Sequence, residues 1–218
     1  LAVNAVTITD NYWFKETDSN LTWENVRFKE NFFDNLALCG DFESFNQPVS
    51  RTPELTNIGS FEKCWRLINN KWWLYKTGNQ LEYFSELFIA KLAEKLGFPM
   101  AKYELHDNYV RTLDFTNGNQ FNFEVAESLV GDNEFYDVNF EKFYSISKDV
   151  AADYLRMIYL DTLCSNVDRH TKNYGVLRDV NSGKIISLAP NYDNNIALIA
   201  RGYPKSTNRE NDKLIDFF

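Results

Sequence analysis

A polar stretch, Ser165–Gly175, most constrains the fold, because it lies between a long helix-like segment and a hairpin-like one. A second polar loop, Asn191–Asn195, follows that hairpin. The two loops carry the carboxylates of Asp168 and Asp193 and the carboxamide of Asn173. Magnesium prefers such oxygen ligands, and it usually takes only one or two protein carboxylates and leaves its other positions to phosphates. The stretch therefore predicts a phosphoryl-transfer centre.

The composition is that of a folded chain with an acidic surface. The 218 residues are 44% hydrophobic and 16% aromatic, which is typical of a globular protein and sufficient for one large domain or two modest lobes. The formal net charge is −8. This charge disfavours extended binding to nucleic acid or to an anionic membrane, so we expect no direct contact with nucleic acid.

Cysteine use and hydropathy bear on the compartment. Cys39, Cys64 and Cys164 are unevenly spaced and form no Cys-x-x-Cys pair, which predicts reduced thiols in a cytoplasmic protein. The chain has two histidines, which disfavours a zinc site. We expect no membrane span and no signal peptide. The chain begins with Leu1, so we expect a trimmed sequence, and delivery as a secreted effector stays an alternative to the cytoplasm.

A β-hairpin is predicted in the first half of the chain. Its strands are Lys63–Ile68 and Lys71–Lys76, joined by an Asn-Asn turn. The preceding loop, Ser50–Glu62, contains hydroxyl side chains and Gly59. Such a loop folds over phosphates by offering backbone N–H groups to their oxygens, although an ordinary surface loop is the alternative.

Lys76 at the end of this hairpin is a candidate phosphate ligand. Alternation along the strand places Lys76 on one face with Trp72 and Leu74, which puts its stem against apolar surface and its ammonium at the rim. A snorkelling lysine without function is the alternative. A phosphate-binding lysine needs an acidic partner to hold it.

The next segment, Gln80–Leu96, is predicted to be a helix that supplies this partner. Asn79 precedes it and Gly97 follows it, as at many helix ends. Glu82 and Glu86 lie four residues apart on one face, of which Glu82 is expected to be solvated. A separate apolar stripe is expected to face the core, and it consists of Phe84, Phe88, Leu92 and Leu96.

A change from strands to helices divides the chain. Strands are predicted at Lys102–Leu105, Tyr109–Phe115 and Gln120–Ala126, and Glu127 then interrupts the pattern. We expect a strand-rich domain at 1–126, with an N-terminal extension at 1–50, and a mainly helical domain at 127–218.

A long helix is predicted in the second domain. Ser147 is its expected N-cap and Cys164 its end. A hairpin, Tyr174–Arg178 and Lys184–Leu188, follows the polar stretch. The helix is expected to contribute Val150, Tyr154, Leu155, Ile158 and Leu163 to the core.

The spacing within the polar stretch matches a phosphotransferase loop. Asn173 follows Asp168 by five residues, the interval between the catalytic Asp and the metal-binding Asn of protein kinases. In that chemistry one carboxylate orients or deprotonates the accepting hydroxyl, and a second carboxylate with a carboxamide holds magnesium. Asp168 fits the first role, while Asn173 and Asp193 fit the second. Lys172 supplies a cation for the transferred group. Turn formation by Asx side chains is the alternative for Asn166, Asp168 and Asn173.

These motifs resemble those of the HipA-like kinases, bacterial serine/threonine kinases whose best-known member is the toxin of a toxin–antitoxin pair. The resemblance covers roughly residues 50–200. It implies an α+β, two-lobed protein-kinase-like fold, with a strand-rich N-lobe, a mainly helical C-lobe and an ATP cleft between them. It rests on Asn166, Asp168, Arg169, His170, Lys172, Asn173 and Gly175, with Ala189, Pro190, Tyr192 and Asp193 downstream, and on the helix segment Ser85–Gly97.

The resemblance also implies roles for individual residues. Asp168 becomes the catalytic base, Lys76 the phosphate ligand, and Glu86 rather than Glu82 the acid that holds Lys76. His170 organises the loop. The implied cofactors are ATP and Mg2+; Asn173 and Asp193 hold the metal, Gly59 and Ser60 belong to the phosphate loop, and Glu127, Ser128 and Leu129 meet the adenine.

The implied activity is ATP-dependent phosphorylation of protein serine or threonine. The implied partners are a protein substrate and an antitoxin or other regulatory protein. Some HipA-like kinases autophosphorylate in the phosphate loop, where Thr56 is the nearest match and Ser60 and Thr52 are alternatives. A lipid kinase and a catalytically silent binding module remain alternatives. The loop has a single glycine, the Phe-Gly after the metal-binding aspartate of ordinary protein kinases is missing, and the C-lobe is expected to be incomplete at its C-terminus.

Overall fold

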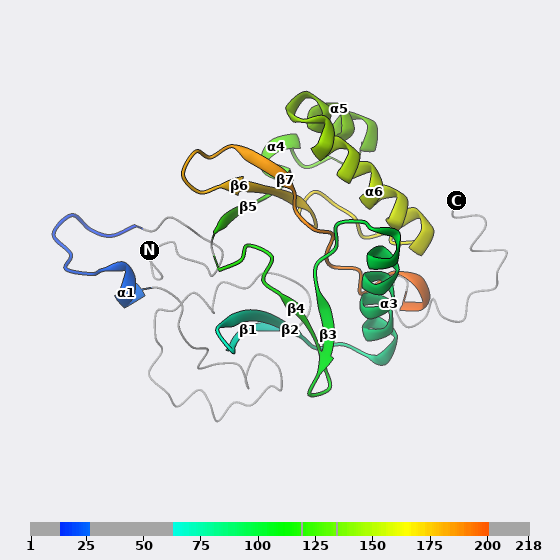
Figure 1. The fold of residues 1–218 in the computed structure, drawn as a ribbon, viewed down its shortest axis with the longest axis horizontal. Helices are drawn as coiled ribbons and strands as arrows, with labels where there is room; N and C mark the ends of the chain where they lie inside the picture. Colours follow the sequence, from blue (N-terminus) through cyan, green and yellow to red (C-terminus); the bar gives the residue numbers. More distant parts are fainter. Residues whose placement is uncertain (1–13, 27–62, 119, 134, 201–218) are drawn as a thin grey trace. The chain divides into compact units, whose positions relative to one another are not determined.

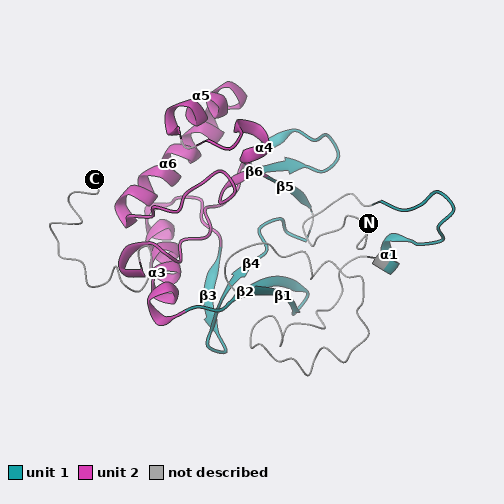
Figure 2. Ribbon diagram, turned by 180° about the vertical axis from the view of Figure 1, so that it is seen from behind, with its two compact units in different colours: residues 1–78, 102–124, 176–187 teal, residues 79–101, 125–175, 188–218 magenta. Residues whose placement is uncertain are grey.

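The fold is that of a computed structural model, which describes residues 14–26, 63–118, 120–133 and 135–200 (Figure 1). The predicted phosphate loop, Ser50–Glu62, lies outside the described residues. The chain divides into two compact units (Figure 2). Unit 1 comprises residues 1–78, 102–124 and 176–187, and unit 2 comprises residues 79–101, 125–175 and 188–218. The predicted folding domains, 1–126 and 127–218, stay a prediction.

Unit 1 is built around a four-stranded sheet with the order β1-β2-β4-β3. All neighbouring strands in it are antiparallel. The predicted hairpin is confirmed, because β1 and β2 pair from Lys63 opposite Lys76 to Ile68 opposite Lys71. Its turn suits asparagine, which tolerates the positive φ of 51° at Asn69 and 60° at Asn70. The strands are β1 (Lys63–Ile68), β2 (Lys71–Lys76), β3 (Tyr103–His106) and β4 (Tyr109–Leu113).

The core of unit 1 corrects the predicted face of β2. Trp73 and Tyr75 are buried with Cys64, whereas the opposite face was expected to lie against apolar surface. Arg111 explains the choice: its guanidinium lies 4.2 Å from the Trp73 ring centroid and donates to the Tyr75 hydroxyl at 2.7 Å. Lys76 was expected at a solvent rim, yet it is only 9% exposed.

A second sheet has three strands in the order β5-β6-β7. The predicted hairpin after the polar stretch is confirmed as β6 and β7. Gly183 in its turn has a φ of 67°, a conformation that favours glycine. An ion pair between Arg178 and Glu124 joins β6 to β5. The strands are β5 (Phe121–Val125), β6 (Gly175–Asp179) and β7 (Ile185–Leu188).

Unit 2 contains most of the described helices (Figure 2). The two longest were predicted with the bounds that the structure has. The helix α5 was not predicted. None of the described helices is long and apolar enough to cross a membrane. The helices are α3 (Gln80–Leu96), α4 (Glu127–Val130), α5 (Tyr136–Ile146), α6 (Lys148–Cys164) and the short 3-10 helix η3 (Leu198–Ala200); α1 (Trp23–Val26) precedes them in the chain.

Local residues fix both ends of α3. The Asn79 side chain accepts from the backbone N–H groups of Leu81 and Glu82, and the Glu82 carboxylate accepts from the Asn79 N–H at 2.8 Å. This reciprocal capping box satisfies donors that a helix start leaves open. Gly97 ends the helix in the left-handed conformation.

The buried face of α3 differs from the predicted one, and that of α6 differs in part, because Val150 and Tyr154 are buried as expected. Phe84 and Phe88 were expected in the core but are 47% and 45% exposed, and their rings stack on each other. On α6, Leu155 and Leu163 are each 50% exposed. The cluster that packs between these helices consists instead of Ile89, Ala93, Leu160, Cys164 and Ala197.

Polar partners explain why α3 turns its smaller face inward. The Ser85 hydroxyl donates to the Ala197 carbonyl at 2.7 Å, and Glu86 accepts from the backbone N–H of Asn194 at 3.1 Å. Buried polar groups need such partners, and the hydrophobic stripe of α3 offers none. Hydrogen bonding with a distant loop has therefore decided the orientation of the helix.

Removing the cap of α3 gives a first test of this fold. Asn79→Ala deletes an acceptor for two backbone N–H groups, so we expect a loss of about 1 kcal/mol in the free energy of unfolding. Urea denaturation followed by circular dichroism measures it. Asn181→Ala, in the exposed β6–β7 turn, is the control and is expected to change stability little. Equal losses in both variants would contradict the role of the cap.

Candidate functional site

Most of the candidate residues lie within unit 2. Lys76 lies in unit 1. Thr52, Thr56, Gly59 and Ser60 lie outside the described residues. The residues in unit 2 are Glu86 on α3, Glu127, Ser128 and Leu129 on α4, Asp168, Lys172 and Asn173 in the loop after α6, and Asp193 in the loop after β7.

The loop after α6 begins with a tight reversal. Ser165 ends the helix in the left-handed conformation, with a φ of 50°. The Asn166 side chain then accepts from the backbone N–H of Asp168 at 3.2 Å. This is the turn-forming behaviour that the sequence left open for the Asx residues of the loop. Asn166 therefore shapes the backbone on which Asp168 lies.

Asn173 joins the far end of this loop to its beginning. Its side-chain nitrogen donates to the carbonyl of Asp168 at 2.9 Å. The contact fixes the orientation of the carboxamide, because the nitrogen faces the loop backbone and the oxygen is left for another partner. Asp168 and Asn173, which the spacing predicted to act together, are thus neighbours in the structure.

The buried guanidinium of Arg169 holds the loop in place. Arg169 pairs with Asp161 of α6 through two hydrogen bonds, from Nε to Oδ2 at 2.8 Å and from Nη2 to Oδ1 at 3.0 Å. Its Nη1 donates to the carbonyls of Asn173 at 2.7 Å and Tyr192 at 2.8 Å. The side chain of Arg169 is 1% exposed and that of Asp161 is 7% exposed, so solvent screens this ion pair little.

The charge of Arg169 is kept despite its burial. Desolvation opposes the charged form, but the attraction and hydrogen bonds of Asp161 outweigh it, with a contribution from Asp193, and the pKa of Arg169 lies above its usual value. Arg169 is therefore a fixed positive charge beneath the two polar loops.

The loop that carries Asp193 is anchored on both sides of that residue. Arg169 holds the Tyr192 carbonyl on one side and, at 2.8 Å, the Oδ1 of Asn194 on the other. Glu86 accepts from the Asn194 N–H and is 1% exposed. Asp193 itself has a φ of 61°, a left-handed conformation that aspartate tolerates better than most residues.

Asp168 and Asp193 influence each other electrostatically. Burial raises the pKa of Asp168, and repulsion from Asp193 raises it further, while His170, Arg169 and Asn173 act to lower it. Both carboxylates are partly exposed. A divalent cation relieves repulsion of this kind, and the available ligands are the oxygens of two carboxylates and one carboxamide. These oxygen donors are of the type that Mg2+ prefers.

The same ligands do not fit a zinc-type centre. Among the described residues, no group of three or more His, Cys, Asp or Glu side chains is arranged to hold a metal. Magnesium does not need such a cage, because substrate phosphates and water complete its coordination.

Lys172 and Glu127, predicted to serve different ends of the nucleotide, lie together. The Lys172 ammonium is 3.3 Å from the Glu127 carboxylate. The backbone N–H of Glu127 also donates to the carbonyl of Thr171 at 3.0 Å. These contacts join α4 to the polar loop. His170 accepts from the Lys172 N–H at 3.3 Å, in agreement with a role in organising the loop.

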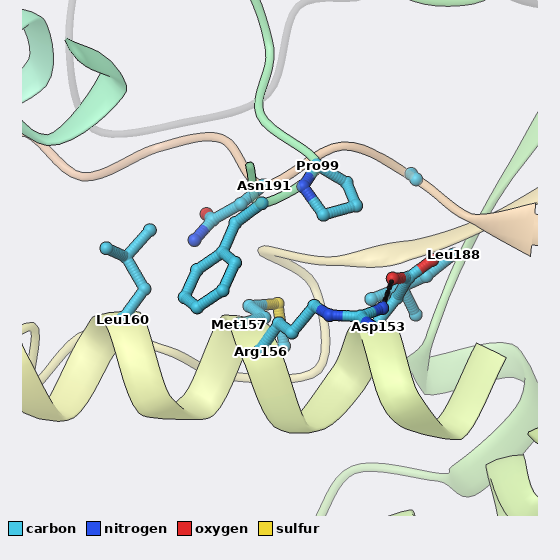
Figure 3. A pocket seen from close by; sticks show the side chains of 9 residues that line it. Pro99, Asp153, Arg156, Met157, Leu160, Leu188 and Asn191 are labelled. Carbon is cyan, nitrogen blue, oxygen red and sulfur yellow. Dashed lines mark hydrogen bonds and ion pairs between the residues drawn. The ribbon is translucent and has the colours of Figure 1, made fainter. Parts of the chain in front are cut away.

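A small pocket of unit 2 lies beside this network (Figure 3). Its walls are largely apolar, with the Asp153–Arg156 ion pair among them. Asn191 lines the pocket, and its Oδ1 also accepts a hydrogen bond from Arg169, so this residue connects the two regions. Asp168, Asn173 and Asp193 are not among the lining residues, which are Phe98, Pro99, Asp153, Arg156, Met157, Leu160, Leu188, Ala189 and Asn191.

Sequence reasoning missed the residues that support the site. Asp161 lies inside a helix where an acid is ordinarily solvent-exposed, and no spacing marked it. Arg169 was part of the motif but received no role. Its signal was present, since an arginine beside a candidate base needs a partner if the loop is buried.

Comparison with known proteins identifies the family. A model of the HipA-like C-terminal domain matches residues 59–214, which is more than half of the chain. The chain therefore belongs to the HipA-like C-terminal domain family, as the motifs predicted. Comparison with curated protein sequences gives no match.

A solved structure supports the fold. The Helicobacter pylori proinflammatory kinase CtkA matches with a TM-score of 0.58 and 23% identity, over 71% of this chain and 61% of that chain. The chain therefore spans less than two thirds of that structure. HipA of Shewanella oneidensis MR-1, solved with HipB and operator DNA, matches with a TM-score of 0.44 and 18% identity, over 59% of this chain and 37% of that chain. The mixed α/β fold with antiparallel strands is shared with CtkA.

The two ion pairs of α6 allow a matched test of the buried one. Asp161→Ala leaves the Arg169 charge buried without its carboxylate, so we expect a loss of about 3–5 kcal/mol in the free energy of unfolding. Asp153→Ala removes the partner of the half-exposed Arg156 from the same helix and is expected to cost at most about 1 kcal/mol. Denaturant unfolding measures both losses. Similar losses for the two variants would contradict the importance given to the buried pair.

Proposed function

We propose that the protein is an ATP-dependent kinase of the HipA-like type, which transfers the γ-phosphate of Mg-ATP to a serine or threonine hydroxyl of a protein. One observation carries this proposal: Asp168, Asn173 and Asp193 lie on two loops that the Arg169 guanidinium ties together. Membership of the HipA-like family supports it. The proposal includes a two-lobed arrangement with an ATP cleft.

Asp168 takes the role of base in this proposal. Its carboxylate is partly exposed and therefore accessible to a substrate hydroxyl, while its backbone is held by Asn166 and Asn173. It orients that hydroxyl and accepts its proton as the hydroxyl oxygen bonds to the γ-phosphorus and the bond from that phosphorus to the leaving ADP breaks. Holding the base in place before the reaction lowers the entropic cost of reaching the transition state.

Asn173 and Asp193 are the residues that hold magnesium in this proposal. Bound magnesium supplies positive charge that offsets the charge of the phosphate oxygens. Asn173 contributes the carboxamide oxygen and Asp193 the carboxylate. The anchoring of the residues on both sides of Asp193 supports this assignment, because a metal ligand must keep its place when the nucleotide leaves.

Lys76 and Glu86 complete the proposed nucleotide site. Lys76 binds the phosphates and Glu86 holds its ammonium. Glu86 already accepts from the Asn194 N–H, but a carboxylate has several lone-pair positions and retains capacity for a lysine. Gly59 and Ser60 cover the phosphates, and the backbone of Glu127, Ser128 and Leu129 meets the adenine. A regulatory partner of the antitoxin type is proposed on family membership alone.

Substitution of the base tests the reaction directly. Asp168→Asn keeps the size and most hydrogen bonds of the side chain but cannot accept the proton, so we expect transfer to fall by about 10²- to 10⁴-fold. Transfer of labelled γ-phosphate to the protein itself and to lysate proteins measures it. Asp149→Asn, at the exposed start of α6, is the control and is expected to retain activity.

The products separate the alternatives. Equal labelling by wild type and Asp168→Asn would remove Asp168 from the role of base. Label found only in lipid would favour the lipid kinase. A wild-type protein that binds no Mg-ATP would favour the catalytically silent binding module.

Autophosphorylation in the phosphate loop is a separate part of the proposal. After incubation with Mg-ATP, we expect phosphate on Thr56, with Ser60 and Thr52 as the alternative acceptors. Peptide mass spectrometry locates it, and the Asp168→Asn variant shows whether the protein itself transferred it. If an active wild-type protein carries no phosphate between Ser50 and Ser60, this regulatory idea is wrong.

A further inference from the structure

Arg169 has more acceptors than a structural ion pair requires. Beyond Asp161, it donates to the carbonyls of Asn173 and Tyr192 and to the side-chain oxygens of Asn191 and Asn194. These acceptors come from both polar loops, while Asp161 comes from α6. One rigid planar group therefore fixes the two loops relative to each other and to the helix.

The acceptors have a specific relation to the candidate site. Arg169 follows Asp168 in the chain, and it binds the backbone of Asn173 directly. It also binds the residues on either side of Asp193. One guanidinium therefore helps to position the proposed base and both proposed metal ligands, through contacts with Asn173 and with the residues next to Asp193.

The orientation of two buried asparagine side chains is determined by their hydrogen bonds to Arg169. Asn191 is 3% exposed and Asn194 is fully buried, and both direct their side-chain oxygen to Arg169. The side-chain nitrogens of both have no hydrogen-bond partner among the described residues. Leaving a buried donor without a partner costs free energy. Both asparagines therefore make the hydrogen bond to Arg169 although their own amide nitrogens stay unsatisfied.

This arrangement is better explained by positioning than by stability. Buried ion pairs are weak evidence for stability, because the cost of desolvation offsets much of the attraction. A guanidinium with fixed directions for its N–H groups is, however, an efficient device for setting distances between loops. A lysine ammonium retains the charge but cannot reach the same set of acceptors.

We propose that Arg169 is a positioning residue that sets the separation of Asn173 and Asp193, and that it thereby determines the affinity of the site for a divalent cation. The inference rests on the proposed function, which supplies these two residues as metal ligands. It adds that the affinity for the metal depends on residues that do not bind it, through the contacts of Arg169 with the loop backbone and the asparagine side chains.

The test compares two arginine-to-lysine substitutions. Arg169→Lys keeps the charge and loses the fork of donors. Arg156→Lys makes the same chemical change in the exposed ion pair of α6 and is the matched control. Binding of Mn2+ in the presence of ADP is followed by electron paramagnetic resonance of free Mn2+. We expect the Kd for Mn2+ to rise about 10- to 100-fold in Arg169→Lys, the usual effect of removing a supporting residue, and to stay at the wild-type value in the control.

A second variant guards against misfolding. Asp161→Asn leaves the Arg169 side chain and its loop acceptors in place but removes the charge that orients it. We expect a smaller rise in the Kd for Mn2+, in the same direction. Thermal unfolding of each variant shows the folded fraction. A folded variant at position 169 or 161 whose Kd for Mn2+ is within about twofold of wild type would overturn the proposal.

The result separates this inference from the proposed function. Wild-type protein that binds Mn2+ and transfers no phosphate, together with weakened binding in Arg169→Lys, would overturn the kinase proposal and retain the positioning role. Wild-type protein that transfers phosphate, with a Kd for Mn2+ that Arg169→Lys does not change, would retain the kinase proposal and overturn the positioning role. Wild-type protein that binds no Mn2+ with ADP would overturn both.

Discussion

The ion pair between Arg169 and Asp161 is the interaction on which the described part of unit 2 depends. Two charges are removed from water there, which is tolerated because each is satisfied by hydrogen bonds in several directions. The pair joins the end of α6 to both polar loops. Through Asn194 it also reaches Glu86 on α3, so helix packing and site geometry share one polar centre.

This shared centre explains how the candidate site is held on loops. Loops are ordinarily more mobile than helices, and a site built on them needs support. Here the support comes from α6 and α3, which carry Asp161 and Glu86 on buried faces. The geometry of the candidate site and the orientation of the helices are therefore coupled: a change that reorients α3 also changes the contact of Glu86 with the loop of Asp193.

Local signals in the sequence predicted the helices and strands well, whereas contacts between residues far apart in the sequence were not predicted. The Asn-Asn turn, the cap at Asn79 and the stop at Gly97 act on their immediate neighbours, and the hairpin and helix that they delimit are where they were expected. The spacing of Asp168 and Asn173 likewise reflects one loop. The buried face of α3 was predicted wrongly, because the N–H that meets Glu86 belongs to a residue more than a hundred positions later.

The left-handed backbone of Asp193 restricts which residues can occupy that position during evolution. Asparagine and glycine adopt this conformation readily, whereas β-branched residues are strained in it. Loss of the charge through asparagine would therefore leave the loop in its present shape. On the proposed function, a single substitution of Asp193 by asparagine would remove a metal-binding carboxylate and keep the backbone of the loop.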